Sequence, residues 1–307
     1  MGLTLASLII FGVGSGYVFT TKAWFEHQAK VQAQQSLRDA VAALTREVRI
    51  AGACMGVPAT QTPLATNFKA LDGASGPPDT LILTTNPRCA GPIGLAAAYS
   101  GGTTIQVTNT LNFQTGMWGF IGDGTTSDAG EYFLITGVTA GAPGTLTISA
   151  ALSGTYPQTT QSVQSFVAGA DRRIFTVSSS CGGCNGIPTL TLQSLGAGAG
   201  QPLVKGIEAM TVQYVLNRKW SDAPSECVSQ TGGTNSLCVV SLPEQSPSVA
   251  GDWKLVRATM LTFGARSTVA VRGTGSADGF YHISESFEIS PRNFVFTITP
   301  RINWTPY

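Results

Sequence analysis

The sequence has few charged side chains, and the two signs nearly cancel. Only 11% of the 307 residues are charged, with 18 basic groups, 17 acidic groups and a formal net charge of +1. A soluble globular protein has about 25% charged residues. Nucleic-acid-binding proteins normally carry a basic stripe and have a high isoelectric point, so this balance argues against that class. The hydrophobic fraction of 43% argues against intrinsic disorder.

Histidine is nearly absent as well. His27 and His282 are the only two, which leaves little room for histidine-based catalysis or a multi-histidine metal site. Residues 282–288 include a histidine, a serine and two glutamates, but not in an arrangement that indicates a serine–histidine–acid set. Segment 122–131 lacks EF-hand spacing, because Asp128 stands where glycine is required. We therefore predict no catalytic residue, no metal site and no cofactor.

One run near the N-terminus carries no charge at all. No residue from Leu3 to Thr20 is charged, and the first charge is Lys22. A helix needs at least about 17 predominantly apolar residues to cross a bilayer, so the sequence predicts a transmembrane helix over residues 3–20. The alternative is a secretory signal peptide. A signal peptide needs a basic segment before the apolar run and a small-residue cleavage site after it, and neither is clear here.

The helical pattern continues beyond this run. Between Ala23 and Ala53 there is no proline and a single glycine. Apolar residues recur at positions 37, 41, 44 and 48, which is the spacing of one helix face. We predict one continuous helix over residues 3–53. Its second part, residues 21–53, is amphipathic and packs its apolar stripe on a globular domain.

After residue 56 the composition turns to glycine, proline, threonine and serine. Short segments rich in β-branched and aromatic residues, separated by turn residues, predict stacked antiparallel sheets. The predicted fold class is α+β, with a long N-terminal helix followed by a β-rich head over residues 54–307. We predict an exposed loop over residues 221–247. The predicted strands are 80–84, 104–107, 132–138, 145–148, 162–167, 173–177, 189–193, 209–216, 255–265 and 287–302.

The six cysteines form an even set, which fits an oxidising compartment. Sequence proximity favours the pairs Cys54–Cys89, Cys181–Cys184 and Cys227–Cys238, among about fifteen possible connectivities.

Cys181 and Cys184 also have the C-x-x-C spacing of redox and metal sites. No helix follows as in thioredoxin-like sites, no second pair exists for zinc, and no histidine follows for haem attachment. We predict a structural disulfide here, with redox or metal chemistry and free thiols as the alternatives.

Four blocks of sequence carry a resemblance to a known family. Residues 2–8, GLTLASL, fit a leader that ends in glycine, followed by a mature start of the form F-T-L-I-E-L. Residues 44–52, LTREVRIAG, look like an R-E/D-I-R-x-A-G signature at the end of a helix. Residues 204–214 and 292–303 look like a middle strand and a closing strand with R-x-N. In this order, the blocks make the chain resemble the type IV pilin superfamily and, within it, the PilW-like minor pilins.

The resemblance implies a processing site and a set of partners. Met1 and Gly2 stand as a residual leader, prepilin peptidase cleaves after Gly2, and the new first residue, Leu3, is methylated. The protein is then held in the bacterial inner membrane until it joins other major and minor pilins in an extracellular pilus filament. Neither nucleic acid nor an enzymatic activity belongs to this function.

One position departs from the family pattern. The fifth mature residue is usually glutamate, and here it is Ser7. In the family, this carboxylate is thought to neutralise the N-terminal amine of a neighbouring subunit, and an amine in a low-dielectric helix bundle is costly unless it is paired. Serine cannot neutralise that charge. The change suggests a subunit at the filament tip or one that initiates assembly, and the alternative is an ordinary polar helix residue.

Three other functions stay open at this point. The first is a minor pseudopilin of a type II secretion system, and the second is a major pilin of the filament shaft. The third, from a different class, is a membrane-anchored β-rich hydrolase or lectin, which predicts a concave site with clustered carboxylates or aromatic rings. The 17 acidic residues are scattered along the chain, which argues against such a cluster.

Overall fold

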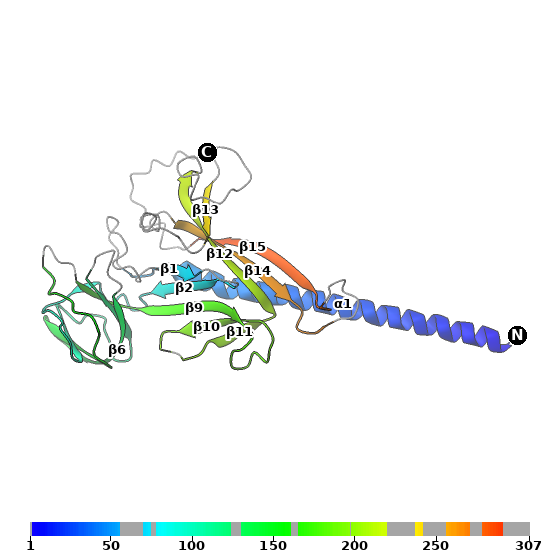
Figure 1. Ribbon diagram of the computed structural model, residues 1–307, viewed down its shortest axis with the longest axis horizontal. Helices are drawn as coiled ribbons and strands as arrows, with labels where there is room; N and C mark the ends of the chain where they lie inside the picture. Colours follow the sequence, from blue (N-terminus) through cyan, green and yellow to red (C-terminus); the bar gives the residue numbers. More distant parts are fainter. Residues whose placement is uncertain are drawn as a thin grey trace.

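One long helix and three antiparallel sheets make up the structure, a computed structural model (Figure 1). The described residues are 2–55, 70–74, 78–123, 130–160, 165–196, 198–219, 237–241, 256–270 and 278–290. Among these, the side chains of residues 2–8, 215–219, 237–241 and 256–257 are not described. The predicted fold class, a helix followed by a β-rich antiparallel region, is confirmed.

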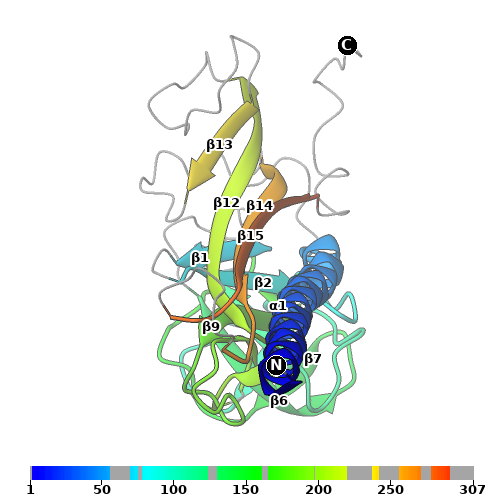
Figure 2. The same cartoon turned by 90° about the vertical axis from the view of Figure 1, so that its right-hand side faces the viewer.

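Helix α1 runs without interruption over Gly2–Ile50. Its N-terminal part extends away from the sheets, and its C-terminal part lies against them (Figure 1). Figure 2, which looks along α1 from its N-terminus, shows the strands β12, β14 and β15 beside the helix. The apolar stripe of the C-terminal part has helical spacing, and its residues are at most 5% exposed. They are Ala29, Ala33, Leu37, Ala40, Leu44, Val48 and Ala51.

The transmembrane prediction needs a correction. Among the residues that the structure describes, no helix is long and apolar enough to cross a membrane. The uncharged run with described side chains covers only residues 9–21 before Lys22 and contains Gly12, Gly14 and Gly16. It is shorter than the roughly 17 residues that a spanning helix needs. The membrane span predicted over residues 3–20 is therefore not found.

Two sheets cover the buried stripe of α1. The five-stranded sheet has the order β1-β2-β9-β10-β11, and the four-stranded sheet has the order β13-β12-β14-β15. Phe175 and Leu81 from the first sheet pack with Tyr214 and Phe263 from the second in one core with α1. The strands are β1 (Leu71–Ala74), β2 (Thr80–Thr85), β9 (Asp171–Ser178), β10 (Thr189–Ser194), β11 (Gln201–Lys205), β12 (Ile207–Lys219), β13 (Leu237–Ser241), β14 (Val256–Arg266) and β15 (His282–Ile289).

The third sheet closes on itself. Its six strands have the order β3-β8-β5-β6-β7-β4. Beyond the end of β3, Leu95 bridges to Val107 of β4, and the Ala96 N–H donates to the Gln106 carbonyl at 2.9 Å. Because the two outer strands meet, the sheet forms a small barrel filled by apolar side chains. Its strands are β3 (Ile93–Gly94), β4 (Thr104–Val107), β5 (Trp118–Gly122), β6 (Glu131–Thr139), β7 (Gly144–Ile148) and β8 (Phe166–Gly169).

This barrel is an insertion between two neighbouring strands. Strands β2 and β9 pair antiparallel, and Thr85 lies opposite Asp171. The chain between them, residues 86–170, leaves the sheet, builds the barrel and returns beside its starting point. Close ends are typical of inserted domains. The barrel lies at the end of the molecule opposite the N-terminus of α1 (Figure 1).

The structure also corrects several predicted strands. Strand β13 lies within residues 221–247, where we predicted a loop, and β15 begins at His282 instead of residue 287. Residues 291–302 of the last predicted strand lie outside the described residues. The pattern missed β5, whose segment WGFIG has no alternation because four of its five residues are buried. It also missed β11, where Pro202 is tolerated because β11 is an edge strand.

We predict that the α1 stripe dominates the stability of the head. Leu44→Ala removes a fully buried side chain at the helix–sheet interface, so we expect it to lower the free energy of unfolding by about 2–5 kcal/mol. Urea denaturation followed by far-ultraviolet circular dichroism measures this change. Arg46→Ala is the control because Arg46 is exposed on the same helix, and we expect a change within about 0.5 kcal/mol. Equal effects of the two variants would contradict the prediction.

Candidate functional site

The protruding part of α1 exposes apolar side chains on all sides. Nine large apolar residues there are between 48% and 76% exposed. They occupy consecutive as well as spaced positions, so they do not form a single face that the head could cover. A contiguous apolar surface of this kind marks an interaction site. The residues are Ile9, Ile10, Phe11, Val13, Tyr17, Val18, Phe19, Trp24 and Phe25.

The polar groups on this part of the helix are satisfied locally. The Ser15 hydroxyl donates to the Gly12 carbonyl at 3.0 Å, and the Thr21 hydroxyl donates to the Tyr17 carbonyl at 2.7 Å. The first ion pair of the helix, Lys22–Glu26, lies beyond the apolar part, with 3.8 Å between its charged atoms. An apolar partner can therefore enclose the serine and threonine hydroxyls of residues 9–21 without leaving them unpaired.

Three glycines on this surface allow a second helix to approach it closely. Gly12, Gly14 and Gly16 have no neighbouring atom within 4 Å of the place where a side chain would begin. Each glycine in a helix interior costs up to about 1 kcal/mol relative to alanine. Small residues allow a second helix to approach the backbone closely, and helix interfaces in apolar surroundings use them for this purpose. The exposed helix thus has the properties of a helix-packing surface.

The predicted processing residues lie at the beginning of this helix. Gly2, Leu3 and Ser7 belong to α1, but their side chains are outside the described part. The cleavage site and the role of Ser7 therefore stay predictions.

The structure forms two of the three predicted disulfides. Cys54 is bonded to Cys89 and Cys181 to Cys184. The second bond closes a turn between β9 and β10, and Cys184 is fully buried there. Cys227 and the side chain of Cys238 lie outside the described residues, so the third pairing is untested. Within the described residues, no three histidine, cysteine or carboxylate side chains group together as metal ligands.

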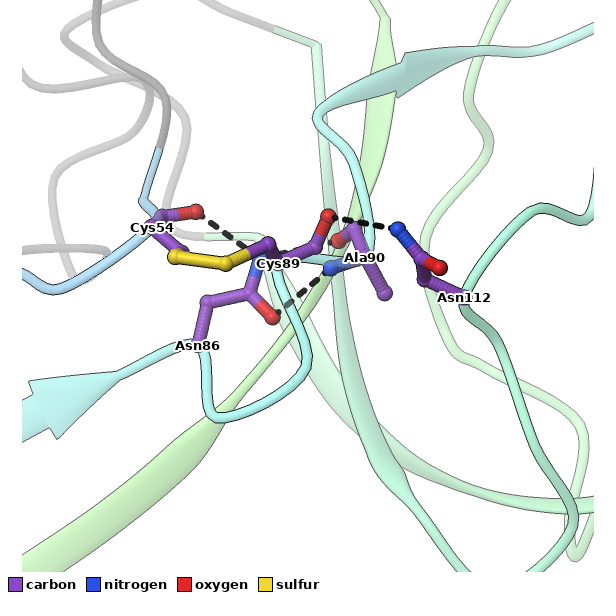
Figure 3. The surroundings of a disulfide bond; sticks show 5 residues. All are labelled: Cys54, Asn86, Cys89, Ala90 and Asn112. Carbon is purple, nitrogen blue, oxygen red and sulfur yellow. Dashed lines mark hydrogen bonds between the residues drawn. A yellow bond between two sulfur atoms is a disulfide. The ribbon is translucent and has the colours of Figure 1, made fainter.

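The Cys54–Cys89 bond is part of a junction that sequence reasoning missed. Asn86 is buried, and its side-chain amide donates to the Cys54 carbonyl at 3.0 Å and to the Ala90 carbonyl at 2.9 Å (Figure 3). Its side-chain oxygen accepts the Ala90 N–H at 3.0 Å, while Asn112 of the barrel donates to the Cys89 carbonyl at 3.4 Å. One asparagine and one disulfide therefore join the end of α1, the five-stranded sheet and the barrel.

His282 joins three elements near the point where α1 leaves the head. Its Nδ1 lies 2.8 Å from Glu208 Oε1, and its Nε2 lies 3.0 Å from Asp278 Oδ2. Hydrogen bonds from Glu208 and then Asp278 raise the pKa of His282 above its ordinary value of 6.5. On the neighbouring segment, the Gln32 side chain of α1 donates to the Thr268 hydroxyl at 2.6 Å. The histidine therefore stabilises the sheet edge that holds the helix, and neither carboxylate is one that sequence proximity grouped with it.

A comparison with protein-family profiles, curated proteins and solved structures finds no match to this chain. The functional argument therefore depends on the geometry described above and on the sequence resemblance.

We predict that the two disulfides differ in their contribution to stability. The Cys54–Cys89 bond closes a separation of 35 residues and the Cys181–Cys184 bond one of 3. The chain-entropy relation gives about 4 kcal/mol for the first and about 1.5 kcal/mol for the second. Urea denaturation should therefore show a larger loss for Cys54→Ala/Cys89→Ala than for Cys181→Ala/Cys184→Ala. The reverse order would contradict the prediction.

We predict a pH-dependent stability from His282. Because its pKa is raised in the folded state, the added stability is fully present below pH 6.5 and is lost as the pH rises through the folded pKa. The titration of its ring protons by nuclear magnetic resonance should give a midpoint above 6.5, and Glu208→Gln should lower that midpoint. His282→Asn should remove this part of the pH dependence of unfolding. An unchanged midpoint in Glu208→Gln would refute the assignment.

Proposed function

We propose that this protein is a structural subunit of a type IV pilus, a minor pilin whose exposed helix packs into the helical core of the filament. Its partners are other major and minor pilins, prepilin peptidase cleaves it after Gly2, and its final location is the extracellular filament. The single observation that carries the proposal is the exposed, uncharged and predominantly apolar surface of α1 over residues 9–21, whose serine and threonine hydroxyls bond to the backbone of the same helix.

Three features support this function over a free-standing domain. The head buries the C-terminal stripe of α1 and leaves the N-terminal part uncovered by any described residue. The uncovered part is apolar all round, so it gains free energy in any apolar surrounding, at about 25 cal/mol for each Å² that is buried. Its glycines allow the close helix contacts that a bundle of such subunits requires.

The tip position is part of the proposal. Ser7 lacks the carboxylate that would pair with the amine of an adjoining subunit, and a subunit that ends the filament needs no such pair. The inserted barrel supports the same position, because it lengthens the head at the end opposite the N-terminus of α1. A head extended along the filament axis would obstruct the next subunit in a shaft but not at a tip.

Isolation of filaments tests the function directly. A tagged full-length protein is produced in a pilus-bearing bacterial strain, and the filaments are sheared from the cells. We expect the protein in the filament fraction at a few copies per filament, with methylated Leu3 as its first residue by mass spectrometry. Absence of the protein from that fraction would overturn the proposed function. A first residue other than Leu3 would overturn the proposed processing site.

We predict that one charge on the exposed helix prevents incorporation. Phe19→Glu places a carboxylate on a side chain that is 74% exposed in the isolated subunit and that the filament core would bury, where an unpaired charge is costly. We expect the variant to be lost from sheared filaments by at least tenfold while its head keeps the parent's unfolding midpoint.

Leu111→Glu is the matched control, because Leu111 is also a large apolar residue, is 71% exposed and lies in the barrel. We expect it to be incorporated normally. Normal incorporation of Phe19→Glu would show that residue 19 does not enter the core.

A further inference from the structure

A pocket lies where the barrel meets the five-stranded sheet. Its volume is about 340 Å³, within the range of small-molecule sites, which occur preferentially at such interfaces. The barrel contributes the start of β5 and the segment before it, and the sheet contributes the start of β9. The turn that contains Pro87 and Arg88 contributes the third wall. The lining residues are Pro87, Arg88, Gln114, Thr115, Gly116, Met117, Trp118, Ala170 and Asp171.

Arg88 gives this pocket a guanidinium group that is paired with no described residue. It is the only basic residue between Lys69 and Arg172. Its side chain is exposed, and no ion pair or hydrogen bond joins it to any other residue that the structure describes. The other charged residue in the lining, Asp171, is engaged by Arg173, whose Nη2 lies 2.9 Å from Asp171 Oδ2 and whose Nη1 also pairs with Glu47 at 2.7 Å. Arg88 is therefore the charged group of the lining that is available to pair with an anionic ligand.

The turn that carries Arg88 is held in a fixed position. Cys89 is tied to Cys54 by the disulfide, and Asn86 accepts and donates hydrogen bonds on both sides of the turn (Figure 3). From the barrel, the Gly169 N–H donates to the Ala90 carbonyl at 2.6 Å. Arg88 thus stands between two anchored residues, and a ligand has to order only the arginine side chain. Preorganisation of this kind lowers the free energy that binding costs.

The remaining walls present both an aromatic ring and neutral polar groups. Trp118 is partly buried, and Gly196 lies against its indole: a side chain there would begin 2.5 Å from Trp118 Cζ2. The glycine is therefore required for the backbone to approach this part of the indole, while Trp118 also lines the pocket. On the open side, Gln114 supplies an amide and Thr115 a hydroxyl, and both are exposed. An aromatic ring contacts the C–H groups of a sugar, while an amide and a hydroxyl bond to its hydroxyls.

We infer that this pocket binds a sugar that carries a carboxylate, a uronic acid, with the guanidinium of Arg88 on the carboxylate and Trp118 beside the sugar ring. Arginine binds carboxylates through two parallel hydrogen bonds, which fixes the orientation of the sugar as well as its charge. The inference does not rest on the proposed function, because the pocket is complete within one chain.

Titration calorimetry on the full-length protein tests this inference, in a polyoxyethylene detergent that carries no sugar. The probes are galacturonic acid, its trimer and the trimer with methyl-esterified carboxyl groups. We expect the acid trimer to bind at least tenfold more tightly than its ester. If the trimer binds more strongly than the monomer, the source of the ligand is a polysaccharide. If the two bind equally, the ligand is a free sugar acid.

Two variants separate the site from general charge effects. Arg88→Gln should weaken binding of the acid trimer at least tenfold without a change in the unfolding midpoint, because Arg88 is exposed and unpaired. Lys205→Gln, at an exposed lysine of β11 outside the lining, should leave binding unchanged. The inference fails if the acid trimer does not bind, if the ester binds equally well, or if Arg88→Gln binds like the parent. Preferential binding of inorganic phosphate or an acidic peptide would assign the pocket to another anion.

Discussion

The burial of one stripe on α1 determines how the rest of the chain is arranged. Small residues at Ala29, Ala33 and Ala40 bring the helix backbone close to the sheets, and Leu37 and Leu44 fill the space between them. Since a helix presents its stripe along a line, two sheets have to meet along that line. The turn between β11 and β12 passes through Gly206, whose φ of +84° and approach to the Arg266 carbonyl exclude a side chain. The chain thus passes directly from the five-stranded sheet to the four-stranded sheet beside the helix.

The end of α1 determines where the barrel lies. Gly52 has a φ of +74° and ends the helix, and its N–H donates to the Thr84 carbonyl at 2.9 Å. Two residues later, Cys54 is bonded to the turn that leads into the barrel. The barrel is therefore attached to the helix as well as to β2 and β9. A force or a displacement along α1 reaches the barrel through covalent and buried polar contacts, without passing through a flexible linker.

The sequence predicted the features that depend on local periodicity. Leu37, Leu44 and Val48 have helical spacing and are buried as that spacing indicates. The barrel could not be predicted in this way, because its closure depends on a bridge from Leu95, which lies outside the regular strands, to Val107 of β4. Asn86 was missed for a related reason: a single asparagine has turn propensity, and only the folded chain brings Cys54, Ala90 and Asn112 around it. The membrane span was predicted from the absence of charge over residues 3–20 alone. Absence of charge does not measure how apolar a helix is, and this run contains three glycines as well as serine and threonine.

The scarcity of charge in the barrel has a physical consequence for what the head can bind. Of its acidic residues, Glu131 serves the structure: it accepts the backbone N–H groups of Ser153 and Gly154 at 2.9 and 2.6 Å. Burial raises its pKa, but these hydrogen bonds outweigh burial and lower the pKa below 4.5. The Glu131 carboxylate therefore stays ionised, and with Asp123 and Asp128 as the only other charged residues in segment 89–170, the barrel carries few charges, all of them negative. In the inferred site, an anionic ligand therefore depends on short-range contacts with Arg88, because the charges of the barrel repel it at longer range.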